Sequence, residues 1–148
     1  MPEKKTLKRA SRAKQRGESP STQAGEFVRE EMDHIREGKH GARNTKQAIA
    51  IGLSKARRAG VKLPPPKQGG ASPSVRKKAE RDLEKGKSSR RPNRNRSRGV
   101  SRALEREGHS AASSQALSRQ AHSAAGKRTT AQRSASAKKA ARTRARSK

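Results

Sequence analysis

Apolar side chains recur at helical spacing in the first half of the chain. The stripe at i, i+4, i+8 and i+11, on one face of an α-helix, consists of Ala24, Val28, Met32 and Ile35. Ser19-Pro20 or Ser21-Thr22 can begin this helix, because serine caps helix N-termini and proline is tolerated at the first position. Gly38 can end it by adopting a positive φ. The pattern therefore predicts a helix that starts near residue 20.

A second apolar stripe follows after a short polar connection. It consists of Ile49, Leu53 and Ala56. Asn44 and Gln47 form a capping-box-like pair at its start, and Gly60 stops the helix. Because the connection has only about six residues, we expect the two helices to be antiparallel neighbours. Residues 20–66 are thus predicted to form a helical hairpin.

Large apolar residues are scarce in the rest of the chain. Ile, Leu, Val and Phe together number 14 of 148 residues, well below the level of about 20% under which a highly charged chain tends to be disordered. A weak helix is expected at 73–85, and a short one is possible near 100–107. The fold-class prediction is a mostly disordered chain with a small all-α module, an antiparallel helical hairpin plus one or two weak helices.

The composition divides the chain into four segments. These are a basic disordered tail at 1–19, the hairpin module at 20–66, a basic linker at 67–107 and an Ala/Ser/Lys/Arg-rich disordered tail at 108–148. The formal net charge is +28, from 40 basic and 12 acidic residues. The hairpin module contributes +4, from nine basic and five acidic side chains, whereas residues 108–148 contribute +10 without an acidic residue.

Such a charge excess predicts a polyanionic partner, because it would otherwise only repel itself. Lys39, Arg43 and Lys46 surround the expected N-terminus of the second helix, where free backbone N–H groups can hold a phosphate. An ordinary solvated connection between the helices is the simpler interpretation and is favoured over a phosphate site here. Other candidate nucleic-acid-binding residues come in basic clusters, namely Arg76, Lys77, Lys78, Arg90, Arg91, Arg94, Arg96, Arg98, Lys127, Arg128, Lys138, Lys139, Arg142, Arg144 and Arg146.

The aromatic content bears on which nucleic acid binds. Phe27 is the one aromatic residue, and the chain has no Tyr or Trp. Modules that read single strands or RNA stack bases on aromatic rings, and we expect Phe27 to lie in the hairpin core. Duplex DNA bound through its backbone is therefore favoured over RNA, with little base specificity.

The sequence offers little material for chemistry. We expect no enzyme and no small-molecule substrate, because a water-excluding pocket needs a core that this composition does not suggest. No metal site and no cofactor are expected, since Cys is absent and a separation of six residues is poor ligand spacing for His34 and His40 on one helix. No stretch approaches the ~20 apolar residues of a membrane helix, so no membrane partner is expected.

One run of residues resembles a known protein family. Residues 46–56 (KQAIAIGLSKA), preceded by residues 27–41 (FVREEMDHIREGKHG), are similar to an uncharacterised family of small basic bacterial proteins. Many members carry Ala and Glu where this chain has Gly52 and Lys55. The resemblance covers residues 20–66, implies a bacterial source and names no activity. Separately, the C-terminal tail resembles in composition the tails of linker-histone-like nucleoid proteins.

These observations lead to one expected function and two alternatives. We expect a non-enzymatic, nucleoid-associated DNA-binding protein of the cytoplasm that neutralises phosphates, with self-association through the hairpin as a further possibility. One alternative is an RNA- or ribosome-associated basic protein. The other is an adaptor whose hairpin binds a protein partner while the tails provide solubility.

Overall fold

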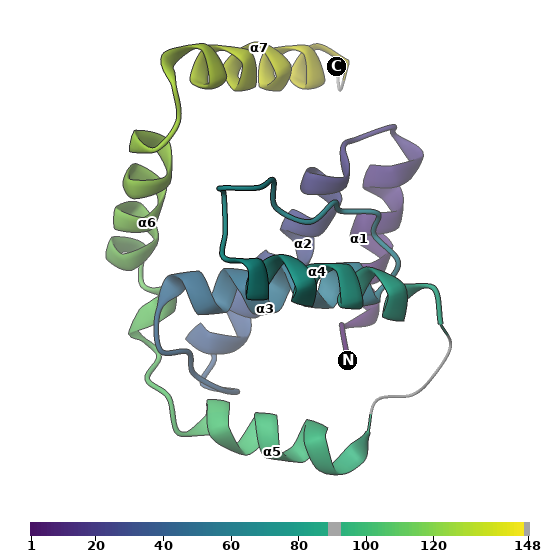
Figure 1. The fold of residues 1–148 in the computed structure, drawn as a ribbon, viewed down its shortest axis with the longest axis vertical. Coiled ribbons are helices and arrows are strands. Elements are labelled where there is room, and N and C mark those ends of the chain that lie inside the picture. Colours follow the sequence, from purple (N-terminus) through teal and green to yellow (C-terminus); the bar gives the residue numbers. More distant parts are fainter. Residues whose placement is uncertain (89–92, 147–148) are drawn as a thin grey trace.

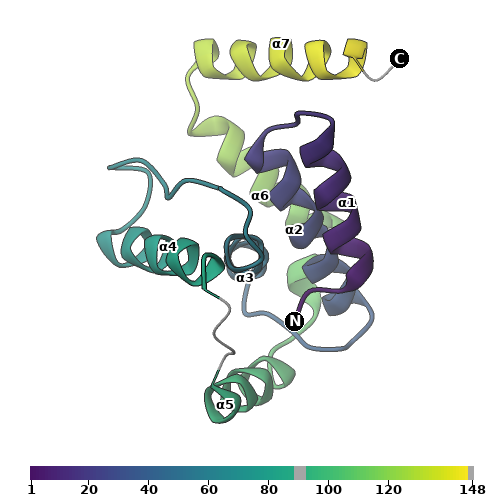
Figure 2. The same cartoon turned by 90° about the vertical axis from the view of Figure 1, so that its right-hand side faces the viewer.

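A computed structural model describes residues 1–88 and 93–146. Over these residues the chain forms seven α-helices and one short 3-10 helix, η1 (Figure 1). Their bounds are α1 Lys4–Gln15, α2 Pro20–Arg36, α3 Thr45–Arg58, α4 Pro73–Gly86, α5 Arg94–Glu105, η1 Ser110–Ala112, α6 Ser114–Gly126 and α7 Thr130–Arg146. Helices α1 to α4 lie together, α6 leads from η1 to α7, and α5 and α7 lie at opposite ends of the molecule (Figures 1 and 2).

The prediction of a mostly disordered chain is wrong, because helices cover most of the described residues, including the two segments predicted as disordered tails. The core that orders them is built largely from small side chains. Its buried alanines are Ala10, Ala13, Ala24, Ala42, Ala48, Ala56, Ala79, Ala111 and Ala112. A count of large apolar residues misses such a core, because alanine is the best helix former and can pack helices closely without adding bulk.

The helix boundaries agree with the local sequence signals. Ser19, the first of the two predicted starts, caps α2, and its hydroxyl accepts a hydrogen bond from the Thr22 N–H at 3.4 Å. The Asn44 Oδ1 atom accepts from the Gln47 N–H at 2.9 Å and so caps α3. The weak helix predicted at 73–85 is α4, and the short helix predicted near 100–107 is the end of the longer α5.

The predicted antiparallel arrangement of α2 and α3 is wrong. Figure 2 looks along the axis of α3 while α2 runs across the view, so the two helices cross. At the crossing Gly52 lies against Val28, where a Cβ atom on Gly52 would be only 2.6 Å from the Val28 Cα atom. The two backbones can approach this closely because glycine has no Cβ. Gly52, where many relatives are expected to carry Ala, is thus the point at which α3 packs against α2.

The short connection between α2 and α3 does not force these helices to be antiparallel, because it is hydrogen-bonded to another part of the chain. The Gly41 N–H donates to the Leu104 carbonyl at 2.8 Å, and the Ala42 N–H donates to the Gly108 carbonyl at 3.0 Å. These two hydrogen bonds hold the connection, residues 37–44, against the chain at the end of α5. The connection is therefore fixed by a segment distant in sequence.

Two hydrophobic clusters join α1 and η1 to α2 and α3. The first comprises Met32, Ile35, Ala42, Ala48, Ala111 and Ala112, with Val28, Ile49 and Leu117 packed against it. The second comprises Ala10, Ala24, Phe27, Ala56 and Val61, with Leu53 and Leu63 packed against it. Helix α1 thus packs on α2, and η1 packs on α2 and α3, so neither segment behaves as a tail.

Polar contacts fix α4 and the segment after α3. Asp82 of α4 is 2% exposed and accepts from the Ser54 hydroxyl at 2.6 Å and from Arg58 Nε at 2.7 Å. Arg57 is also buried and donates to the carbonyls of Leu63 at 3.2 Å and Pro64 at 3.3 Å. Burial lowers the pKa of the Arg57 guanidinium from its ordinary value, an effect that the charge of Asp82 opposes.

The outer helices are different in character. Within the described residues, α5, α6 and α7 contain no buried residue, although Leu117 of α6 packs partly against the first cluster. None of the described helices combines the length and apolar character that crossing a membrane requires.

The close crossing at Gly52 can be tested by substitution. We expect Gly52→Leu to lower the free energy of unfolding by about 1–3 kcal/mol, because the side chain would have to force the two helix backbones apart. The control is Gly25→Leu in α2, at an exposed position where a Cβ atom meets nothing within 4 Å. Leucine should be neutral or stabilising there because of its helix propensity. Urea unfolding followed by circular dichroism measures both, and equal effects would contradict the crossing.

The role of η1 in the core can be tested in the same assay. Ala112 is 0% exposed, so Ala112→Glu should lower the free energy of unfolding by at least about 2 kcal/mol, because it buries a charge without a partner. Ala121→Glu, at an exposed position of α6, is the matched control and should have little effect. If both variants are as stable as the wild type, residues 108–148 are not part of the folded core.

Candidate nucleic-acid interface

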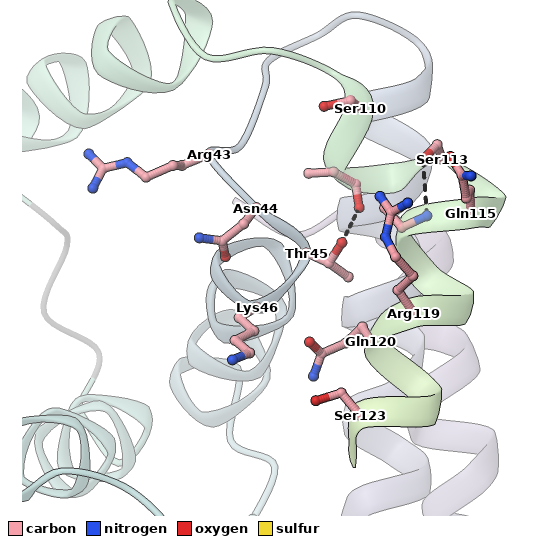
Figure 3. A pocket seen from close by; sticks show the side chains of 12 residues that line it. Arg43, Asn44, Thr45, Lys46, Ser110, Ser113, Gln115, Arg119, Gln120 and Ser123 are labelled. Carbon is pink, nitrogen blue, oxygen red and sulfur yellow. Dashed lines mark hydrogen bonds between the residues drawn. The ribbon is translucent and has the colours of Figure 1, made fainter. Parts of the chain in front are cut away.

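A basic groove lies between the start of α3 and the η1–α6 segment (Figure 3). It encloses about 570 Å³ and is lined by residues of two ranges, 43–46 and 110–123. Its cations are Arg43, Lys46 and Arg119, and none of the described residues that line it is acidic. The groove therefore carries a net positive charge that would attract an anionic group.

Local structure positions both walls of the groove. The Thr45 hydroxyl donates to the Ala111 carbonyl at 2.7 Å in a buried contact, which joins the start of α3 to η1. Ser113 caps α6 by accepting from the Ala116 N–H at 3.2 Å. The N-termini of α3 and α6 therefore both border the groove, and their helix dipoles add to its positive potential.

Two of the groove's cations, Arg119 and Arg43, point in different directions. Figure 3 shows Arg119 extending from α6 beside Thr45, whereas Arg43 points away from the groove. The Arg43 side chain is 78% exposed, and its Nε atom lies 3.9 Å from Glu107 Oε1, a loose contact. Arg119 was not among the sequence-predicted site residues, because it is an isolated arginine in an Ala/Ser-rich run.

Lys39 does not join the groove. Its Nζ atom lies 2.9 Å from Glu37 Oε2 and 3.3 Å from Glu3 Oε1. The contact with Glu37, followed by the one with Glu3, raises the pKa of Lys39 above its ordinary value. Arg43 and Lys46 thus line one groove, whereas Lys39 belongs to an ion-pair cluster with Glu3 and Glu37.

The remaining predicted cations are distributed over several helices. Arg76 is half-buried in α4, and Lys77 and Lys78 beside it are exposed. The other described ones are exposed on α5, on α7 or between α6 and α7, namely Arg94, Arg96, Arg98, Lys127, Arg128, Lys138, Lys139, Arg142, Arg144 and Arg146. Arg90 and Arg91 lie outside the described residues.

Helix α7 has the simplest charge pattern. The sequence has no Asp or Glu after Glu107, so no carboxylate side chain in that region can neutralise its cations. Lys138, Arg142 and Arg146 recur at i, i+4 and i+8, so they lie along one side of the helix about 6 Å apart. None of the described residues of α7 is buried. This helix therefore presents a row of cations to solvent.

A second cluster of ionisable groups surrounds Glu31, away from the groove. Lys55 Nζ lies 2.6 Å from Glu31 Oε2, and His40 Nε2 lies 2.9 Å from Glu31 Oε1. The His34 ring centroid is 6.0 Å from that of His40, and His34 Nε2 lies 2.9 Å from Glu3 Oε1. The hydrogen bond from His34, followed by the contact with Lys39, lowers the pKa of Glu3 below its ordinary value.

The spacing of six residues predicts no shared site for His34 and His40 only if both lie on one helix. In the structure His34 lies on α2, whereas His40 follows the end of that helix. His40 follows Gly38, which ends the helical segment with a φ of +72°, so the chain turns back and returns His40 to Glu31. The predicted stop at Gly38 was the signal that could have located this cluster.

The fold and the groove define a basic, all-helical protein over the described residues. Residues 3–68 match the model of a family of unknown function (DUF6496). The match identifies an uncharacterised domain that contains α1, α2 and α3, whereas α4 to α7 lie outside it. No curated protein and no solved structure matches the chain.

The groove can be tested by removing its charge. We expect Arg43→Ala/Lys46→Ala/Arg119→Ala to weaken duplex DNA binding and to reduce the slope of log K against log salt by up to ~2.7, since each phosphate contact contributes about 0.9. Arg29→Ala/Lys62→Ala/Lys67→Ala removes the same charge from exposed positions outside the groove. Fluorescence anisotropy over a salt series measures both variants. If the groove variant loses no more affinity than this control, the groove is not part of the DNA-binding interface.

Proposed function

We propose that this protein binds duplex DNA without base specificity, by neutralising backbone phosphates with its exposed helices and its basic groove. The observation that carries the proposal is α7, in which exposed cations recur along one side and no acidic residue is present. Release of condensed counterions from DNA would supply most of the binding free energy.

The burial of the single aromatic residue favours duplex DNA over single strands. Phe27 is 1% exposed and belongs to the second core cluster. Its ring is therefore unavailable for stacking on an unpaired base, which single-strand and RNA-reading modules use. Contact with the phosphates of a duplex needs no such platform.

The positions of the basic helices favour contact with more than one stretch of duplex. Helices α5 and α7 lie at opposite ends of the molecule (Figures 1 and 2). A duplex bound at α7 leaves α5 free for a second one, which would bridge DNA segments and raise avidity. This arrangement, and the compositional likeness of residues 108–148 to linker-histone-like tails, supports a nucleoid-associated role.

The proposal is tested with a variant in which the five C-terminal cations of α7 become glutamine, at Lys138, Lys139, Arg142, Arg144 and Arg146. We expect weaker binding to random duplex DNA and a salt slope reduced by up to ~4.5, at about 0.9 per phosphate contact. Because none of the described residues of α7 is buried, the free energy of unfolding should not change. Anisotropy over a salt series measures the binding.

Competition separates the possible partners. Duplex RNA, single-stranded DNA and duplex DNA of equal charge are compared at one salt concentration. A marked preference for either of the first two would overturn the choice of duplex DNA. Binding that is insensitive to salt, or that survives the α7 substitutions unchanged, would overturn the mechanism of phosphate neutralisation.

A further inference from the structure

Glu31 is a buried carboxylate at the contact of α2, α3 and the connection between them. Its side chain is 1% exposed. Lys55 and His40 lie within ion-pair distance of its two oxygens, yet neither oxygen has a partner in hydrogen-bonding geometry. A buried charge is costly unless a hydrogen bond or a second ion satisfies it. These two contacts therefore leave the hydrogen-bonding capacity of the Glu31 carboxylate unused.

The tautomer of His40 also indicates that a positive species would stabilise the contact between His40 and Glu31. His40 Nδ1 lies 3.0 Å from the Gly41 carbonyl oxygen, which can only accept, so Nδ1 carries the proton. In a neutral ring, Nε2 then has a lone pair, and it faces the Glu31 Oε1 atom at 2.9 Å. Two acceptors at this distance repel unless a positive species lies between them. A proton or a metal ion can fill that role.

A second histidine favours the metal ion. His34 lies one helical turn after Glu31 on α2, and Glu31, His34 and His40 each offer a ligand atom within 4.8 Å of the other two. Ligand atoms at about 2.0–2.1 Å from a tetrahedral zinc ion lie about 3.3 Å apart. The widest separation would therefore close by up to about 1.5 Å, and the 2.9 Å contact between Glu31 Oε1 and His40 Nε2 would open slightly. Rotation of the His34 and His40 side chains would supply this movement, because the Gly41 and Ala42 hydrogen bonds hold the backbone of the connection in place.

The surroundings of His34 and His40 match those of metal-binding histidines. The Gly41 carbonyl contacts His40 Nδ1, and the Glu3 carboxylate contacts His34 Nε2. A carbonyl or carboxylate on a ring nitrogen is the usual partner that orients a metal-ligating histidine. Lys55 lies on the Glu31 oxygen that faces away from His40, so Oε1 remains available to the ion.

We propose that Glu31, His34 and His40 bind one divalent transition-metal ion of the zinc class. Two imidazoles and one carboxylate suit zinc and its neighbours, whereas Mg²⁺ and Ca²⁺ prefer oxygen ligands throughout. The ion would tie the connection that carries Arg43 to α2, so its role is structural. The site is independent of phosphate binding and does not rest on the proposed function.

The test uses untagged full-length protein freed of metal by a chelator. We expect one Zn²⁺ per chain by isothermal titration calorimetry and a rise in Tm of about 5 °C or more when Zn²⁺ is in large excess over its Kd. His34→Gln/His40→Gln should lose the Tm shift and weaken binding at least tenfold. The control is His109→Gln/His122→Gln, which alters the other two histidines, both exposed, and should bind like the wild type. Mg²⁺ should produce no shift.

A measurement on the unaltered protein covers the case in which the double variant does not fold. Zn²⁺ should shift the ring NMR signals of His34 and His40 and leave those of His109 and His122 in place. Equal shifts at all four histidines, equal Zn²⁺ binding by the two double variants, or the same Tm shift with Mg²⁺ would overturn the proposal. The absence of saturable Zn²⁺ binding would do so as well.

Discussion

The fold depends on the close contact between the backbones of α2 and α3. At Gly52 the two helices come so near that a Cβ atom would lie 2.6 Å from the Val28 Cα atom. Because the helices cross, each leaves surface free for other elements, and alanines on α1, η1 and the connecting segment fill it. A core of such small side chains buries limited apolar area per residue. The stability of this core therefore depends more on close approach of the helix backbones than on large side chains. Moving α2 and α3 apart would also weaken the contacts that the surrounding alanines make with them.

Buried and exposed charged residues differ in how they are paired in this structure. Two acids buried in the core have cationic partners, Glu31 with Lys55 and Asp82 with Arg58. The cations without acidic neighbours in sequence are concentrated on α7, outside the core. A chain of net charge +28 can fold in this way, because these buried acids are paired and the cations of α7 are exposed. Exposed cations in water and salt repel one another only weakly. The same exposure makes these cations available to a polyanion.

Some of the fold could be read from the chain. Ser19, Asn44, Gly38 and Gly60 mark ends of α2 and α3, because caps and glycine stops act within one turn. The burial of Phe27 and the grouping of Arg43 with Lys46 were also predictable, since both follow from a single helix or its start. Disorder was predicted wrongly because large apolar residues were counted and alanines were not. The antiparallel hairpin was wrong because loop length was used without the Gly41 and Ala42 hydrogen bonds that hold the loop elsewhere.

The sequence by itself determined where the central helices begin and end, and that the charge lies mainly outside residues 20–66. These properties are local or additive, so they need no knowledge of distant residues. Only the tertiary structure decided that α3 crosses α2, that Ala111 and Ala112 complete the core, that Arg119 joins Arg43 and Lys46, and that His40 returns to Glu31 and His34. Each of these joins residues far apart along the chain or separated by a turn. Such contacts depend on the directions in which the helices pack, and here packing is set by small residues that leave little trace in a hydrophobic pattern.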